Sequence, residues 1–402
     1  CGDSVMKQMK AKTFVILIIS AFVAASAILA SANIFANATW SKHLKSDWKS
    51  GRIWGSDAWA MIENKTNYIS QKGLPYNAFL FGGSKSGAMQ GRTLKKYTGN
   101  DFYNYWTNGG CFENYEMFCN HILKTYKDIN EVIICLSSHE VEHFKAGWKL
   151  IPSKIQNIPF AYWKIKAKLL KEKYLNINTF TDLYKKRNTE NLEPLMFSDG
   201  GRDCSLYVAK RNENEEKFIK ERVLPYWHLQ DGGWEKSLHD LFYREPQLLA
   251  CDENIAALKR IQAKLDARGI KLTIVIMPTF VAEIHKYTTP QFVQYLKDLV
   301  AVQQVWNFSG LNDVDLNPYN FSDGGHCFDF VADKMIETMY SPEPNTRDMD
   351  AFGILLNADN IDTYLESQKQ KWLALKAEYD TTGTIALLGK SDASYLGNAD
   401  YK

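Results

Sequence analysis

Three residues, a serine, an aspartate and a histidine, carry the clearest potential for chemistry in this sequence. Ser84 follows an apolar run that ends in two glycines, and about 240 residues later Asp323 precedes His326 by three positions. A serine hydroxyl is a weak nucleophile until an imidazole accepts its proton, and a carboxylate that fixes the imidazole tautomer makes a better base. The sequence therefore predicts a catalytic set of Ser84, His326 and Asp323, with Ser86 as the second candidate nucleophile.

The elements that must position these residues alternate between short apolar runs and segments of helical spacing. We expect strands at Asn77–Gly82, Glu131–Leu136, Lys271–Met277 and Val302–Phe308, and helices at Tyr115–Tyr126 and Glu253–Arg268. Such alternation predicts an α/β protein with three α/β/α layers and a mostly parallel sheet. Ligands in these sheets bind beyond the carboxyl ends of the strands, and Ser84 lies at such an end.

The local sequence around each catalytic candidate suits its role. Glycines before Ser84 let the backbone turn sharply, which exposes Oγ and points the serine N–H toward a developing oxyanion. An amphipathic stretch, Cys327–Ile336, follows the Asp-Gly-Gly-His peptide and predicts a helix. Residues three apart at a helix start can present both side chains to one cleft. The alternative is that Asp323 caps this helix and His326 is an ordinary surface residue.

The segment from about 145 to 250 interrupts the alternation, and we expect a helical insertion over the active face. Within it, Ala161–Arg187 is rich in lysine and aromatic residues, which suits either an anionic membrane surface or a solvated helix face. Phe197–Arg202 is predicted to be a turn, and its first five residues recur at 321–325. We expect the main domain to span 39–345 and a polar C-terminal segment, 346–402, to contain a helix at Asn360–Tyr379.

Composition excludes some classes of function. Lys and Arg total 48 against 46 Asp and Glu, so the formal charge of +2 provides no field for gripping a nucleic-acid backbone. A hydrophobic content of 45% indicates a folded core. The cysteines show neither zinc-ligand spacing nor a dense disulfide pattern, so we expect free, mostly buried thiols.

The N-terminus, residues 1–38, has the pattern of a membrane anchor or signal segment. Three lysines precede an apolar run, Phe14–Ala36, which is long enough to span a bilayer. Small residues at Ala30–Ala32 and Ala36–Ala38 also suit signal cleavage. Either way the main domain is expected outside the cytoplasm, on a single N-terminal span or as a periplasmic or secreted protein.

A rival motif lies at 139–143, where His139, Glu140 and His143 fit the zinc-peptidase pattern His-Glu-x-x-His. In that pattern the two histidines bind zinc one helical turn apart and the glutamate acts as base. A third histidine ligand does not follow at the usual spacing. We therefore expect no metal and no cofactor, and the zinc peptidase is kept as an alternative. In the main interpretation His139 lines the serine cleft.

Five blocks then support a resemblance to a known family. They occur in order as Phe79–Ser84, Tyr103–Gly110, Glu131–Ser138, Ile274–Pro278 and Trp306–Gly310, the last leading to Asp323 and His326. Over roughly residues 77–340 the chain resembles the SGNH (GDSL-like) hydrolases, most of all the branch of the lipoteichoic acid D-alanylation and alginate acetylation proteins. The resemblance implies an SGNH/flavodoxin-like fold, with Ser84 as nucleophile, His326 as base and Asp323 as its orienter.

The oxyanion donors are where the chain departs from this pattern. The resemblance assigns one donor to the amide of Gly109 or Gly110. The usual Gly-x-Asn-Asp of the third block is replaced by Leu136-Ser137-Ser138-His139, so Ser138 and His139 are the remaining candidates in the cleft.

The resemblance implies an extracytoplasmic acyl-transfer protein that O-acetylates a cell-surface polysaccharide through an acyl-serine intermediate. Its partners would be the polysaccharide acceptor and a membrane-bound O-acyltransferase that supplies acyl groups. The same residues would serve a carbohydrate or lipid esterase, in which water attacks the acyl-serine. A catalytically inactive scaffold of polysaccharide export or modification is the third interpretation.

Overall fold

The structure is a computed structural model that describes residues 12–33, 58–137, 175, 196–225, 233–243, 250–281 and 287–389. The chain divides into two compact units, one made of 1–50 and 148–192 and the other of 51–147 and 193–402. The first unit contributes one described helix, Lys12–Asn33. All other described residues except residue 175 belong to the second unit.

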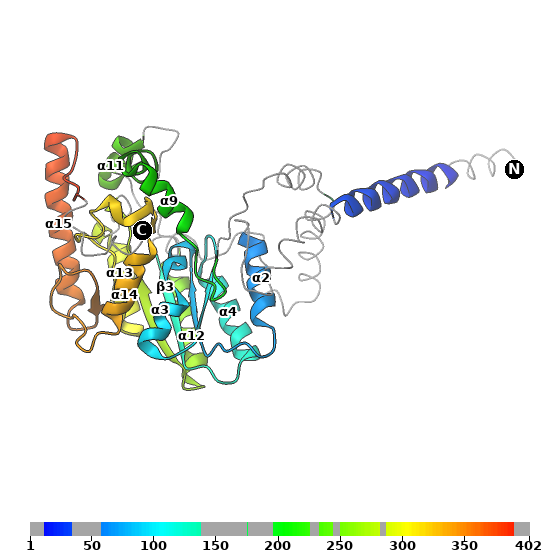
Figure 1. The fold of residues 1–402 in the computed structure, drawn as a ribbon, viewed down its shortest axis with the longest axis horizontal. Helices are drawn as coiled ribbons and strands as arrows, with labels where there is room; N and C mark the ends of the chain where they lie inside the picture. Colours follow the sequence, from blue (N-terminus) through cyan, green and yellow to red (C-terminus); the bar gives the residue numbers. More distant parts are fainter. Residues whose placement is uncertain are drawn as a thin grey trace, which may run out of the picture. The chain divides into compact units, whose positions relative to one another are not determined.

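A six-stranded sheet forms the centre of the second unit (Figure 1). Its order is β2-β1-β3-β4-β5-β8, and all neighbouring strands are parallel except β8, which runs antiparallel to β5. The strands are β1 (Ala78–Gly82), β2 (Phe102–Trp106), β3 (Glu131–Leu136), β4 (Lys271–Ile276), β5 (Val305–Asn307) and β8 (Ile354–Leu356). Strands covered on both faces are apolar throughout rather than alternating, and β1 is buried at every position.

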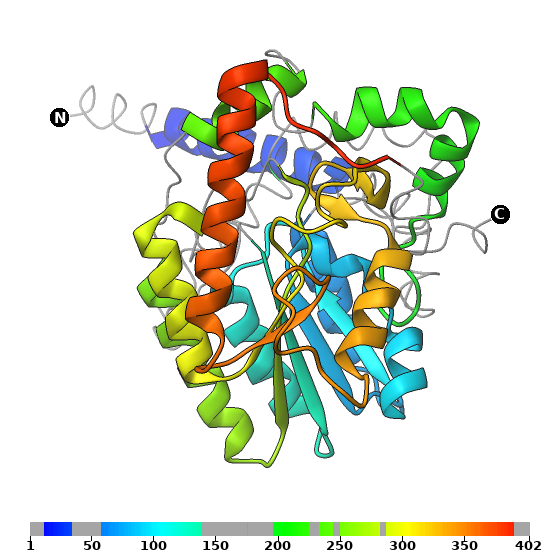
Figure 2. The ribbon, with the colours of Figure 1, turned by 90° about the vertical axis from the view of Figure 1, so that its left-hand side faces the viewer.

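Helices cover both faces of the sheet (Figure 2). On one face α12 packs against α4 and α13, and on the other α3 packs against α14. The bounds are α2 (Ala58–Ile69), α3 (Gly91–Thr98), α4 (Phe112–Thr125), α12 (Cys251–Asp266), α13 (Pro290–Val302), α14 (Asp329–Met339) and α15 (Ile361–Thr382). The predicted α/β class with three layers and a mostly parallel sheet is confirmed.

The predicted strands and helices are present with shifted ends. The run Glu131–Leu136 is β3 without change, whereas the run predicted from Val302 begins only at Val305 because Val302 ends α13. β2 lies in no predicted run. It is an edge strand with a buried Asn104 in its middle, and this polar residue interrupts the apolar pattern.

The prediction of a helix start at Asp323 and His326 is wrong. These residues lie on a hairpin of β6 (Phe321–Asp323) and β7 (His326–Cys327), where Asp323 pairs directly with His326. Two glycines between them form the turn, and α14 begins after its N-cap, Phe328. The N-cap interpretation of Asp323 is therefore wrong as well.

The segment from about 145 to 250, called the middle segment below, is mainly helical in its described part from Ser205 onward. Its helices are α9 (Ser205–Glu213), α10 (Glu215–Phe218), the π-helix η2 (Ile219–Val223) and α11 (Gly233–Tyr243). The turn predicted at Phe197–Arg202 is confirmed by a hydrogen bond from Gly200 N to Phe197 O of 3.0 Å. The lysine-rich stretch, residues 161–187, lies outside the described residues except at residue 175.

Two expectations about the rest of the chain are also confirmed. The helix expected at Asn360–Tyr379 is α15, and five of the six described cysteines are buried thiols. The N-terminal helix Lys12–Asn33 has a mean hydropathy of 2.6 over its 18-residue apolar window. It is long and apolar enough to be a membrane span or a signal sequence.

Candidate active site

Ser84 begins the 3₁₀ helix η1 (Ser84–Ala88) directly beyond the carboxyl end of β1. Gly82 permits this turn, because a Cβ there would lie 2.2 Å from Ser86 Oγ. The Ser84 side chain is half-buried, whereas Ser86 is buried and its Oγ donates to Gly83 O at 2.7 Å. Of the two candidate serines, Ser84 is therefore the one with access to solvent.

Residues of the second block hold this turn in place. Asn104 Nδ2 donates to Ser86 O and to Met89 O, each at 2.8 Å. Gly110 is buried against the backbone before Ser84, since a Cβ on Gly110 would lie 2.8 Å from Gly82 O. Gly109, with φ of 58°, forms the exposed turn before it. Of the two glycines expected near the oxyanion, Gly110 thus lies beside the nucleophile turn, and Gly109 precedes it on the exposed side.

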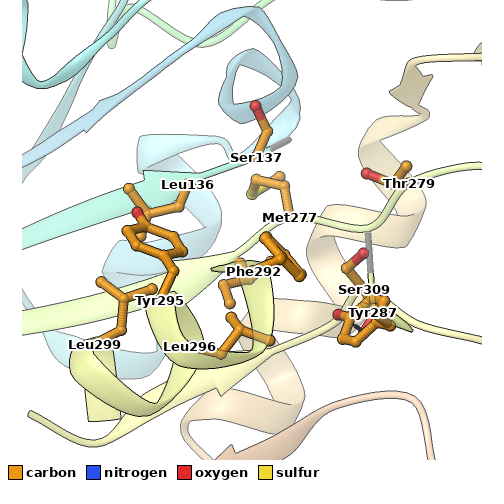
Figure 3. Close-up of a pocket in the computed structure, with 11 residues that line it drawn as sticks. Leu136, Ser137, Met277, Thr279, Tyr287, Phe292, Tyr295, Leu296, Leu299 and Ser309 are labelled. Atoms are coloured by element: carbon orange, nitrogen blue, oxygen red, sulfur yellow. Dashed lines mark hydrogen bonds between the residues drawn. The ribbon is translucent and has the colours of Figure 1, made fainter. Parts of the chain in front are cut away.

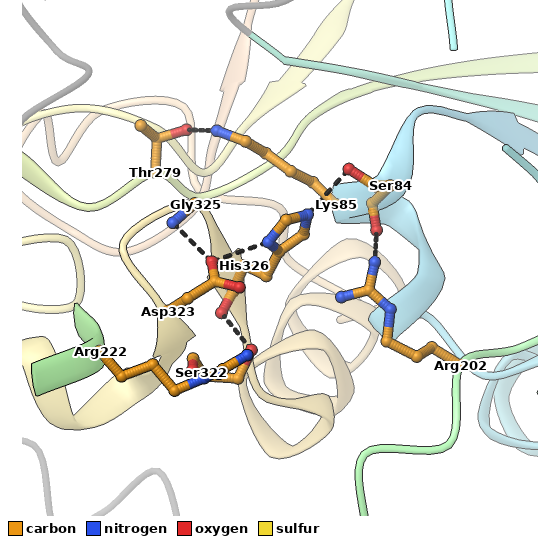
Figure 4. Close-up of polar contacts among 9 residues, drawn as sticks. All are labelled: Ser84, Lys85, Arg202, Arg222, Thr279, Ser322, Asp323, Gly325 and His326. Atoms are coloured by element: carbon orange, nitrogen blue, oxygen red, sulfur yellow. Dashed lines mark hydrogen bonds and ion pairs between the residues drawn. The ribbon is translucent and has the colours of Figure 1, made fainter. Parts of the chain in front are cut away.

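Asp323, His326 and Ser84 form one continuous chain of hydrogen bonds (Figure 4). Asp323 Oδ1 lies 2.7 Å from His326 Nδ1, and His326 Nε2 lies 2.8 Å from Ser84 Oγ. Asp323 Oδ1 also accepts from Gly325 N at 2.9 Å, which fixes the carboxylate within the hairpin turn. The arrangement has the geometry that general-base activation of a serine requires.

The surroundings keep the histidine neutral and the aspartate ionised. Burial lowers the pKa of His326 below its ordinary value, the Arg202 and Lys85 charges lower it further, and Asp323 acts in the opposite direction. Burial alone would raise the pKa of Asp323, but the His326 hydrogen bond and charge, together with the Gly325 amide, hold it below its ordinary value. A neutral imidazole beside an ionised carboxylate is the state in which a base accepts a proton.

Two cations that sequence reasoning did not assign to the site flank the nucleophile. The Arg202 guanidinium donates through Nη2 to Ser84 O and lies 4.9 Å from the centre of the Trp106 ring. On the other side, Lys85 Nζ donates to Thr279 Oγ1 at 3.0 Å. Neither contact has a sequence signature, because each joins residues more than 100 positions apart.

Ser138 and His139 lie outside the described residues, as do Glu140 and His143 of the rival motif. Ser137, at the end of β3, is half-buried and borders an apolar cavity of about 30 Å³ between β3, β4 and α13 (Figure 3). Thr279 borders the same cavity and accepts the Lys85 hydrogen bond. Thr279 therefore connects the cavity, through one hydrogen bond, to Lys85, the residue after the nucleophile candidate.

Side chains of the middle segment pack near the β6–β7 hairpin. Trp234 of α11 lies 5.6 Å from Phe280 between ring centres, and Phe280 lies 5.6 Å from Phe321 of β6. Arg222 of η2 lies over the Tyr207 ring at 4.6 Å and donates through Nε to Ser322 O at 2.8 Å.

Comparison with protein-family models gives no match to this chain, and comparison with curated proteins gives none either. The functional interpretation therefore depends on the geometry of Ser84, His326 and Asp323.

Proposed function

We propose that this chain is a serine-dependent acyl-transfer enzyme of the SGNH type, which O-acetylates a cell-surface polysaccharide. The observation that carries the proposal is the hydrogen-bonded chain from Asp323 through His326 to Ser84, at the carboxyl end of a parallel strand. A half-buried, neutral imidazole that contacts both a carboxylate and a half-buried hydroxyl fits nucleophilic catalysis better than a packing role.

The reaction has two steps that share one base. Ser84 Oγ attacks the carbonyl carbon of an acyl donor while its proton passes to His326 Nε2, and the leaving group then takes that proton as the acyl-serine ester forms. A sugar hydroxyl next attacks the ester carbonyl, gives its proton to Nε2, and Ser84 Oγ recovers a proton when the product leaves. Asp323 stabilises the imidazolium in both steps.

The negative oxygen of each tetrahedral intermediate needs donors that are already in place. The backbone segments that meet beside Ser84 are the start of η1 and the Gly109–Gly110 turn. The amides of Ser84 and Gly110 are our candidates for these donors. Arg202 and Lys85 add positive charge on either side of the nucleophile.

Aromatic packing by the middle segment favours transfer over hydrolysis. An acyl-serine must survive until the sugar arrives, so a transferase keeps water from its cleft. Trp234 and Phe280 form an aromatic row that ends on Phe321, in the strand that carries Asp323. In this proposal the N-terminal helix is a single-span anchor, and a membrane-bound O-acyltransferase supplies the acyl group.

Covalent labelling tests the nucleophile. A fluorophosphonate should modify Ser84 in the intact protein, and Ser84→Ala should abolish the label while Ser86→Ala keeps it. The site of modification is read by peptide mass spectrometry. Persistent labelling of Ser84→Ala would show that another residue is the nucleophile.

Product analysis separates the proposed transferase from the esterase that the same triad supports. The protein is incubated with a small acetyl ester and an acidic or neutral oligosaccharide, and acetylated sugar and free acetate are both quantified. The proposal expects acetylated oligosaccharide that disappears in Ser84→Ala. Free acetate without acetylated sugar would establish an esterase, and the absence of both products would favour an inactive scaffold.

A further inference from the structure

Two arginines of the middle segment contact the backbone on the two sides of the triad (Figure 4). Arg202 donates to the carbonyl of Ser84 itself, and Arg222 donates to the carbonyl of Ser322, the residue before Asp323. The nucleophile follows a strand of the main sheet, whereas the His-Asp pair lies on β6 and β7, which form a two-stranded sheet of their own. In the part of the chain that the structure describes, the main sheet has no ladder hydrogen bonds to this hairpin.

Contacts of both its backbone and its side chain hold Arg202 in place. Its N donates to Gly87 O at 2.7 Å, and its carbonyl accepts from Gln90 Nε2 at 2.9 Å, so its backbone is tied to the nucleophile helix and the residues after it. The residue is 9% exposed, and its side chain packs on Trp106. An anchored guanidinium of this kind holds the carbonyl it contacts at a fixed distance.

The turn that carries Arg202 is itself docked on β2. Asn104 N donates to Asp199 O at 2.7 Å, while Trp106 Nε1 and the buried Lys65 Nζ donate to Gly200 O at 2.8 Å and 3.2 Å. Gly200 has φ of 82°, and a Cβ there would lie 2.2 Å from Asn104 O. The turn and the sheet edge are thus in backbone contact, which leaves Arg202 little freedom to move.

Arg222 holds a backbone carbonyl of the β6–β7 hairpin in a similar way. Its guanidinium lies between Tyr207 and Phe218, at 4.6 Å and 5.9 Å from the ring centres, and η2 packs against β6. Ser322 is buried and its Oγ donates to His326 O at 3.1 Å. A shift of Ser322 would therefore move the histidine backbone as well.

We propose that Arg202 and Arg222 are positioning residues that fix the nucleophile turn and the His-Asp hairpin relative to each other. This inference rests on the proposed function. Proton transfer from Ser84 needs donor and acceptor within hydrogen-bond reach, and a misplacement of about 1 Å can cost on the order of 100-fold in rate. In this protein the middle segment supplies that alignment through one contact on each side.

The two arginines differ in their effect on the pKa of His326, and a purely structural role would not produce this difference. Among the described residues, the charges that act most on His326 are those of Asp323 on its own hairpin, Arg202 on the docked turn and Lys85 on η1. Arg202 lowers the pKa of His326, so removal of its charge should raise that pKa. Arg222 contacts a backbone carbonyl four positions from His326 and acts through geometry.

The test is the rate of fluorophosphonate labelling of Ser84 as a function of pH, in the full chain. Arg202→Gln should label roughly 10- to 100-fold more slowly. Its acid limb, the part of the pH profile in which the labelling rate falls as the pH decreases, should be displaced to higher pH. Arg202→Lys should be slow with the limb unmoved, because the charge remains and the planar donor is lost. Arg222→Gln should also be slow with the limb unmoved.

Arg268 provides a matched control. It donates to the carbonyls of Leu123, Tyr126 and Lys127 at the far end of α4, so Arg268→Gln should change neither rate nor limb. If Arg202→Gln does not fold by circular dichroism, Arg202→Lys and Arg222→Gln decide the matter. Wild-type rates in both would overturn the inference and leave the proposed function intact, whereas a wild type that never labels would remove the proposed function first and the inference with it.

Discussion

His326 lies between a carboxylate and a hydroxyl, and its two ring nitrogens have different roles. Nδ1–H donates to Asp323, which leaves the Nε2 lone pair facing Ser84 Oγ. The His326 and Asp323 side chains are 17% and 19% exposed, so the carboxylate acts on the ring through little intervening water. The site is thus prepared for proton transfer before any substrate binds.

The first prediction concerns pH. Because the pKa of His326 lies below its ordinary value of 6.5, the neutral, active imidazole should predominate at pH 6.5 and above. The rate of Ser84 labelling should be flat from about pH 7 to 8 and fall as acid protonates the ring below pH 6.5. The measurement is the labelling rate across this range. A midpoint of the labelling profile above pH 7 would mean that the pKa of His326 is not lowered by its surroundings.

The second prediction concerns the orienting carboxylate. Asp323→Asn removes the acceptor that selects the Nδ1–H tautomer, so labelling of Ser84 should fall by up to about 10⁴-fold while the fold persists. Labelling kinetics and circular dichroism measure the two parts. Asp362→Asn, on an exposed aspartate of α15, is the control and should label at the wild-type rate. An unaffected Asp323→Asn would show that another group orients His326.

At the scale of elements, the nucleophile turn depends on close backbone packing. The Gly109–Gly110 turn after β2 meets the end of β1 with no room for a side chain, and Thr107 N donates to Gly82 O at 3.0 Å. Two adjacent parallel strands therefore fix the position of Ser84 together.

The third prediction follows from this packing. Gly110→Ala places a Cβ 2.8 Å from Gly82 O and 2.9 Å from Gly83 Cα, and backbone atoms cannot move aside as a flexible side chain can. The variant should lose about 1–3 kcal/mol of stability and most of its labelling. Gly99→Ala is the control, since φ there is 74° but nothing lies within 4 Å, so it should lose stability without losing labelling. Thermal unfolding and labelling rates test both, and rapid labelling of Gly110→Ala would contradict the packing argument.

The elements also show what the sequence can and cannot predict. Central strands such as β1 and β3 are continuous apolar runs, so their positions follow from burial on both faces. The β6–β7 hairpin is harder to predict from the sequence, because Asp-Gly-Gly-His before an amphipathic stretch suits a helix start as well as a two-residue turn. The arginine contacts have no local pattern at all, since they join side chains to distant carbonyls.

At the scale of the whole second unit, residues after α14 contribute both to the sheet and to the loop that precedes the β6–β7 hairpin. β8 pairs with the free edge of β5, and the chain after α15 crosses toward the loop before β6 (Figure 2). There Leu388 N donates to Leu316 O at 3.1 Å, and Asn317 Nδ2 donates to Gly389 O at 2.8 Å. The sequence predicts the α15 helix in this region, but β8 has three residues, too few for a recognisable pattern.

The fourth prediction concerns the N-terminal helix. If it anchors the protein, the full chain should sediment with membranes, and Phe22→Lys with Val23→Lys should release it, since each lysine at the centre of a span costs about 2.5–3.5 kcal/mol. Phe22→Leu is the control and should stay bound. Fractionation and N-terminal peptide mapping provide the measurement. A soluble wild-type product that begins near Thr39 would identify a cleaved signal instead.

The hydrogen bond between Ser84 and His326 joins residues 242 positions apart, and this separation has a consequence for the order of folding. Loop closure over such a length adds little equilibrium cost, because each doubling of the loop adds only about 0.6 kcal/mol, but distant contacts form late. During synthesis β1 and η1 emerge long before the hairpin that carries the base. In the proposed function the nascent chain therefore bears an inert serine, and Ser84 becomes reactive only once the hairpin that carries His326 has been made and folded.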